Sequence, residues 1–193
     1  ADDLEASFSG GAMTFIKKLT ASSSATLSFV NGSSDVVLDS TYKEYLFLFK
    51  DIHHSEADRN LSFNLSIDSG SNYNVAKTTT FFYATHSEDD GGGAIEYRTG
   101  TDLAQGTGVQ PMMQGIKGDN DSSGAGYMHL FNPGSTTFVK HFLCNNVLMQ
   151  DNTLVQNTYI GGYGNTTSAI DAIQFSVNSG NIDAGTITLY GIN

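Results

Sequence analysis

The densest cluster of potential metal ligands and acid–base groups is the segment "DIHHSEADRN", residues 51–60. Imidazole and carboxylate groups together can bind zinc or transfer protons. On a strand, however, His53 and His54 would point to opposite faces, so both cannot bind one ion unless the chain turns there. No His-x-His or His-x3-His spacing elsewhere supports a zinc site. We therefore interpret the segment as a solvated turn that follows a strand.

A second cluster is "GDNDSSGAG", residues 118–126, in which Asp119 and Asp121 are the candidate calcium ligands. The twelfth position from Asp119 is Leu130, where an EF-hand requires a glutamate, and no helical pattern flanks the loop. A calcium site of another kind is one interpretation of these residues. The other is an ordinary Asp/Asn/Gly turn that needs no ion.

No residue pattern selects a catalytic or cofactor site. The sequence lacks G-x-S-x-G, and "GGYGN" at residues 161–165 lacks the Lys-Ser/Thr pair of a phosphate loop. Glu44, Glu88 and Glu96 could serve glycoside chemistry, but nothing singles out a pair. Cys144 is the sole cysteine and lies among apolar residues, which predicts a buried structural thiol. We predict no catalytic residues, no cofactor and no enzymatic activity.

Aromatic residues offer a different kind of chemistry, since an exposed tyrosine can stack on a sugar or fill a protein contact. The candidates are Tyr73, Tyr127, Tyr159 and Tyr163. The alternative interpretation is that they are rim aromatics of two β-sheets.

Composition narrows the classes of partner and of fold. The 193 residues carry a formal net charge of -11, which argues against binding nucleic acid or an anionic membrane surface. No stretch approaches the roughly 18 apolar residues of a membrane span, so we expect no membrane insertion. With 21 Gly, only 2 Pro, 12 Phe and 9 Tyr, the chain has the composition of an all-β protein with many short connections.

The elements that must position these residues are strand-like runs separated by Gly, Asn, Asp and Ser turns. They cover residues 15–20, 25–30, 43–52, 61–67, 76–85, 94–99, 126–131, 136–144, 154–163, 169–177 and 185–192. In "LSFNLSI", residues 61–67, apolar side chains alternate with polar ones, so we predict one buried and one solvated face. The helix candidates are short turns near residues 103–105 or 109–114.

This spacing predicts an all-β fold: an antiparallel two-sheet sandwich, jelly-roll-like, of roughly ten strands. Residues 13–193 would form this single domain. Residues 1–12 show no periodicity and end in a Gly-rich stretch, so we expect an extended N-terminal arm or linker. Either the initiator Met preceded Ala1, or Met13 is the natural start.

Three segments carry a resemblance that covers the chain from about Met13 to Ile192. They are "STYKEYLFLFKDIHHSEADRNLSFNLSIDSGSNYN" (40–74), "HLFNPGSTTFVKHF" (129–142) and "YIGGYGNTTSAIDAIQFSVNSGNIDAGTITLYGIN" (159–193). Their order and the "LYGI" ending resemble a family of small bacteriophage virion structural proteins from marine and cyanobacterial phages. The resemblance implies an all-β domain on the virion exterior and no catalytic or metal residues. The residues before "MTFIKK" depart from the family pattern.

The resemblance leads us to expect a non-enzymatic structural protein on the virion surface, most readily in capsid decoration, assembled in the host bacterial cytoplasm. The alternative is a tail-fibre or receptor-contact protein of the same virion, and a further alternative is a carbohydrate-binding module braced by calcium. The expected partners are other virion proteins and further copies of the chain, with a trimer as the usual form. A host-surface glycan is the expected ligand of the receptor-contact alternative.

Overall fold

The computed structural model describes residues 12–150 and 153–193, and every regular element in these ranges is a β-strand. The twelve strands found there are β1 (Met13–Thr20), β2 (Thr26–Val30), β3 (Glu44–His54), β4 (Arg59–Ser66), β5 (Lys77–Ser87), β6 (Gly93–Tyr97), β7 (Gln110–Ile116), β8 (Gly124–Phe131), β9 (Lys140–Gln150), β10 (Leu154–Gly164), β11 (Ala172–Val177) and β12 (Ile182–Ile192). The predicted all-β class is confirmed, with more strands than expected. Apart from Ala12, the predicted arm lies outside the described residues.

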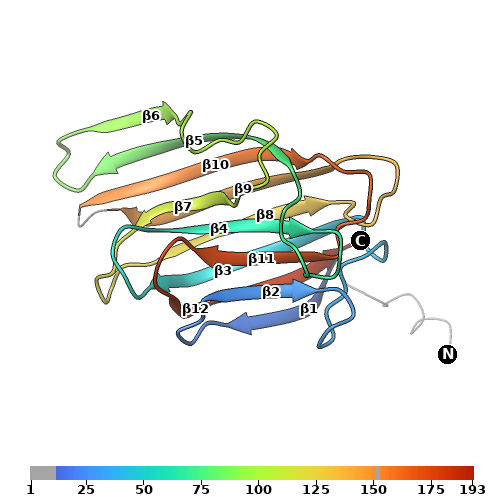
Figure 1. The fold of residues 1–193 in the computed structure, drawn as a ribbon. Helices are drawn as coiled ribbons and strands as arrows, with labels where there is room; N and C mark the ends of the chain where they lie inside the picture. The colour runs from blue at the N-terminus through green and yellow to red at the C-terminus, as the bar shows by residue number, and fades with distance from the viewer. Residues whose placement is uncertain (1–11, 151–152) are drawn as a thin grey trace, which may run out of the picture.

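The strands form two groups in which every pairing is antiparallel. Eight lie in the order β1-β12-β3-β8-β9-β10-β5-β6 and four in the order β2-β11-β4-β7. We call them the eight-strand layer and the four-strand layer; the latter lies in front of much of the former in Figure 1. A single pair, Ile116 with Gln150, joins β7 to β9, so the whole sheet curls toward a barrel.

Aromatic side chains from both layers meet in the core. Phe175 of β11 packs edge-on against Phe47 and Phe49 of β3, with ring centroids 5.5 and 5.2 Å apart. Phe63 of β4 meets Phe142 of β9 at 5.0 Å in the same manner. Edge-to-face packing of this kind is the preferred arrangement of buried rings. Side chains alternate along a strand. On each strand of the eight-strand layer, the residues next to these core residues therefore face away from the four-strand layer. We call that surface the outer face.

Residues 110–116 form the strand β7, so the prediction of a helical turn at residues 109–114 is wrong, and residues 103–105 are not helical either. Met112 and Met113 are consecutive and both fully buried, which removes the alternation that marks a strand. The Gln110 side chain is buried too, accepting from Thr79 Oγ1 at 2.6 Å. Burial on both faces therefore hid this strand in the sequence.

The predicted solvated face of β4 is also buried, which corrects the interpretation of "LSFNLSI". Leu61 and Phe63 face the core as expected, but Asn64 on the opposite face is only 4% exposed. Its side-chain amide donates to the carbonyls of Tyr73 (2.6 Å) and Thr107 (3.0 Å), which lie in the connections on either side of the β5–β6 hairpin. These loops cover the polar side of β4 and satisfy its hydrogen bonds.

Candidate functional site

The histidine segment is a strand for longer than the sequence predicted. Pairing with β12 extends β3 through His54, so the turn begins only at Ser55. The interpretation as a solvated turn is therefore wrong for both histidines, which lie on opposite faces of β3: His54 is fully buried, whereas His53 stays partly exposed. His53 Nδ1 lies 2.7 Å from Asp183 Oδ1, and its Nε2 lies 3.0 Å from the carbonyl oxygen of Asp119. A His53 ring with a proton on each nitrogen can donate to both oxygens at once.

This arrangement changes the pKa of His53. Burial alone lowers it, but the hydrogen bonds to Asp183 and to the carbonyl of Asp119 outweigh that effect, so the pKa lies above its ordinary value. His53 therefore ties β3 to β12 and to the loop before β8 most firmly when it is charged.

The two candidate calcium ligands, Asp119 and Asp121, make different contacts. Asp119 uses its main-chain oxygen, which accepts from His53 and from the Ser122 N–H at 2.9 Å. Asp121 lines a surface hollow together with Asp51 and Asp183. Within residues 12–150 and 153–193, no three His, Cys, Asp or Glu side chains are placed to hold a metal ion. Residues 119–122 form a turn closed by the Ser122 N–H, whereas residues 124–126 are already part of β8.

Cys144 is buried, as the sequence predicted, and burial raises the pKa of its thiol well above the usual value. It points into the core from β9, so it has the environment of an inert structural cysteine. Of the three glutamates considered for glycoside chemistry, Glu44 is hydrogen bonded to His129 Nδ1 and Glu96 accepts from Tyr83 at 2.8 Å.

Two of the four candidate tyrosines lie close together on the outer face. Tyr127 of β8 and Tyr159 of β10 flank the same residue of β9, Asn145, one from each side. Tyr163 lies on the same face nearer the end of β10, and Tyr73 lies in the loop after β4. The strand register thus selects Tyr127 and Tyr159, which sequence spacing could not distinguish from the others.

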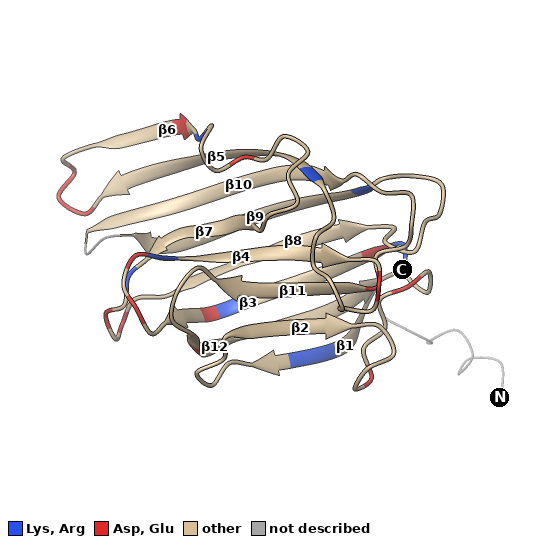
Figure 2. Cartoon of the chain, in the orientation of Figure 1, with Lys and Arg blue, Asp and Glu red and all other residues tan. Residues whose placement is uncertain are grey.

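The outer face is apolar and almost free of charge at its centre. Of the thirteen large apolar side chains exposed among the described residues, ten lie here: Met13, Phe15, Phe82, Ile95, Tyr97, Tyr127, Leu143, Val147, Val155 and Tyr159. The strands β8, β9 and β10 together contain a single Lys, Arg, Asp or Glu, Lys140, whose side chain is buried. Figure 2 shows the middle of this layer in tan, with much of the charge in connecting loops.

A hollow of about 520 Å³ lies in the middle of this face, over β3, β8, β9, β10 and β5. On one side Phe82 and Tyr159 stack in parallel, with ring centroids 5.0 Å apart and planes 7° apart. On the other side Tyr127 packs edge-on against His129, at 5.3 Å. Leu143 and Asn145 of β9 lie between the two groups of rings, and Gly161 of β10 lies in the lining beside Tyr159. This hollow, which we call the central hollow, is the candidate functional site.

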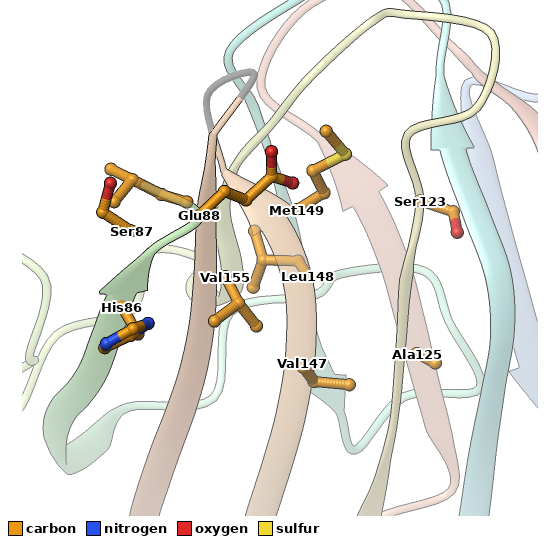
Figure 3. A pocket seen from close by; sticks show the side chains of 10 residues that line it. His86, Ser87, Glu88, Ser123, Ala125, Val147, Leu148, Met149 and Val155 are labelled. Carbon is orange, nitrogen blue, oxygen red and sulfur yellow. The ribbon is translucent and has the colours of Figure 1, made fainter. Parts of the chain in front are cut away.

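A second hollow, of about 440 Å³, lies toward the other end of the same strands (Figure 3). Val147 of β9 and Val155 of β10 contribute apolar side chains, and His86 and Glu88 lie on the β5 side. Ala125 of β8 borders it opposite. It lacks the paired aromatic rings of the central hollow, so it is less suited to recognising a ligand.

Sequence reasoning missed Phe82, His129 and Gly161. The doublet Phe81-Phe82 was the available signal, because neighbouring strand residues face opposite ways and one ring must therefore leave the core. Phe81 is indeed fully buried, whereas Phe82 is exposed. No comparable signal marked His129 or Gly161, whose roles depend on which strands are neighbours.

No protein-family model matches the chain, and no curated protein or solved structure matches it either. Among the residues that the structure describes, no helix has the length and apolar character needed to cross a membrane.

Proposed function

We propose that this chain is a non-enzymatic structural protein on the exterior of a bacteriophage virion, in capsid decoration. The segments that resemble phage virion proteins support the proposal. The observation that carries it is the exposure of large apolar side chains on both outermost strands of the eight-strand layer. These strands are β1 and β6, each of which pairs along one side only among the described residues.

The two edges have the character of contact surfaces. Ile95 of β6 is 81% exposed and Phe15 of β1 is 59% exposed. Every residue of β6 is exposed, so this strand buries almost none of its surface within the described part of the chain. An uncovered edge with apolar side chains invites pairing with another chain, and a closed symmetric assembly is a common way to cover it. The protein therefore makes contacts through its edges with further copies, a trimer being the first arrangement to test, or with other virion proteins.

We also infer that the strands other than β5, β6, β9 and β10 have a jelly-roll topology. The order β1-β12-β3-β8 in one layer opposite β2-β11-β4-β7 in the other supports this. In such a fold most successive strands lie in opposite layers, β4 and β7 being the exception here, and the two added pairs of strands widen one layer beyond the other. Jelly rolls occur in viral capsid domains and in lectins, so the topology is compatible with the proposed role without deciding it.

The location is tested by immunogold electron microscopy of phage particles from cultures that produce the chain, with antibodies against the purified protein. We expect label on the outside of the heads. Label confined to tails would instead support the tail-fibre or receptor-contact alternative. Production of the chain without labelled particles would contradict both.

The edge contact is tested by the substitution Ile95→Lys. It places a charge on the β6 edge, so we expect the number of copies per particle to fall several-fold. Ile67→Lys is the matched control, because Ile67 is also exposed, at 43%, but lies beyond the end of β4. Quantitative mass spectrometry of purified particles measures the copies. Equal numbers of copies per particle for the two variants would show that β6 is not part of the contact.

The calcium-braced carbohydrate-binding module is a less supported alternative. Such a module would need a calcium site, and no group of three or more His, Cys, Asp or Glu that could hold a metal ion is present among the described residues. Binding of a sugar without calcium is a separate question, which the central hollow raises.

A further inference from the structure

No close contact and no backbone angle requires Gly161 to be a glycine, and its main chain is hydrogen bonded to the Thr80 hydroxyl, at 3.2 Å through its carbonyl and 3.3 Å through its N–H. It lies within β10, in the interior of the eight-strand layer, where a glycine makes a strand less stable than an alanine does. A Cβ built on Gly161 would meet only Leu143 Cδ2 at 3.4 Å and Thr80 Oγ1 at 3.6 Å, which are ordinary contact distances. Its φ is also outside the left-handed region.

The next residue shows what a structural glycine looks like in the same strand. A Cβ on Gly162 would lie 2.6 Å from the carbonyl oxygen of Thr78 and 2.9 Å from Phe142 Cζ, so the core requires glycine there. Gly161 faces the opposite way, toward the central hollow. A glycine within a strand often marks a place where a ligand approaches the backbone closely, and the hollow gives that ligand a position.

The register of the strands explains the shape of the hollow. Gly161 pairs with Leu143 on β9 and with Thr80 on β5, and Leu143 pairs in turn with His129 on β8. The adjacent row of outward residues contains the rings of Phe82, Tyr159 and Tyr127. A glycine in the first row thus leaves a depression beside exposed rings, and its volume lies within the range of small-molecule sites.

The lining of the hollow is mostly apolar with a few polar groups, which favours an uncharged ligand that has both an apolar face and hydroxyl groups. Glu44 is its only acidic lining residue and is hydrogen bonded to His129, while Asn145 adds a side-chain amide. No Lys or Arg lines the hollow, and the whole chain carries a net charge of -11, so the electrostatics oppose an anionic ligand. A pyranose ring has an apolar C–H face that packs on the negative face of an aromatic ring, and hydroxyls that suit amide and carboxylate groups.

We propose that the central hollow binds a neutral hexopyranose unit of a glycan, packed over Gly161 beside the exposed rings. As a host-surface contact of the virion, this role rests on the proposed function. The binding itself is a property of the purified chain, so particle labelling and sugar binding can fail independently of each other.

The experiment uses the full chain and two probes. One is an array of neutral and acidic glycans, and the other is saturation-transfer NMR with the methyl glycosides of glucose, galactose, mannose and glucuronic acid. We expect binding to at least one neutral glycan and no preference for glucuronide, which differs from glucoside by its carboxylate. Absence of neutral binding by both methods, or binding restricted to acidic glycans, would overturn the proposal.

Two variants alter the hollow in different ways. Gly161→Val fills the depression, and Tyr127→Ala removes a ring, so we expect each to weaken binding about tenfold or more, which corresponds to about 1.4 kcal/mol. Tyr190→Ala is the matched control, since it removes a tyrosine of β12 from the same face, several strands away from Gly161 and outside the hollow. Its affinity should stay within about twofold of the wild type.

Circular dichroism establishes whether each variant is folded. If Gly161→Val does not fold, the sugar affinity of Tyr127→Ala is the test of the proposal. Unchanged affinity in the folded hollow variants would place the sugar elsewhere and overturn the proposal. A second copy of the chain could occupy the hollow in place of a sugar, and light scattering tests this by measuring the oligomeric state. If Gly161→Val converts an oligomer to monomers, the hollow is a contact between copies and not a glycan site.

Discussion

His53 and His54 are neighbours on β3, yet their surroundings shift their pKa values in opposite directions. Burial lowers the pKa of His54 to about 4, since a charged ring would be enclosed in the core. For His53, burial also lowers the pKa, but the hydrogen bonds to Asp183 and to the Asp119 carbonyl raise it overall. The two residues therefore give opposite dependences of folding stability on pH.

The signs follow from linkage. The stabilisation from His53 is complete below its unfolded pKa of about 6.5 and is lost as the pH rises through its higher folded value. The stabilisation from neutral His54 is complete above about 6.5 and is lost as the pH falls toward its folded value, by roughly 1.4 kcal/mol per pH unit.

We therefore predict distinct pH profiles for two variants. His53→Gln should reduce the loss of unfolding free energy as the pH rises above about 6.5, and His54→Leu should reduce the loss as the pH falls from about 6.5 toward 5.5. Urea unfolding at several pH values measures both. Each variant serves as the control for the other, and parallel profiles for wild type and both variants would contradict this account.

At the scale of elements, Phe175 connects β11 with the opposite layer. Its ring contacts those of Phe47 and Phe49 and also that of Phe29 on β2, 6.3 Å away. Phe175→Ala should lower the free energy of unfolding by roughly 3–5 kcal/mol, because it leaves a cavity where three strands meet. Phe138→Ala removes a ring that is 68% exposed and should change it by less than about 0.5 kcal/mol. Similar losses in thermal or urea unfolding would show that Phe175 is not central to the core.

The predictability of an element depended on how its two faces are covered. Where one face is buried and the other solvated, alternation is visible, and "TITLY" at residues 186–190 correctly predicted the core of β12. In β7 the consecutive buried residues Met112 and Met113 erased the alternation, so the strand was missed. In β4 the alternation was visible but misleading, because loops far along the chain bury its polar side through Asn64.

At the scale of the whole molecule, one apolar cluster spans both layers. It includes Phe29 and Phe175 of the four-strand layer and Phe47, Phe142 and Phe81 of the eight-strand layer. We predict that residues 13–193 unfold in a single cooperative transition, since neither layer keeps a core without the other. Far-ultraviolet circular dichroism and tyrosine fluorescence should give coincident urea curves. An earlier transition in either signal would contradict a single cooperative unit and show that part of the fold unfolds separately.

The sequence by itself determined the all-β class and the position of most strands, because alternation and turn residues are local properties of the chain. It also predicted the buried thiol of Cys144 from its apolar neighbours. Only the tertiary structure decided which strands are adjacent, and hence the candidate site. Glu44 and His129 are 85 positions apart in the chain, and Gly161 meets Thr80 only through the pairing of β10 with β5. Such a site arises from strand register, which depends on the packing of the whole sheet and leaves no local pattern in the sequence.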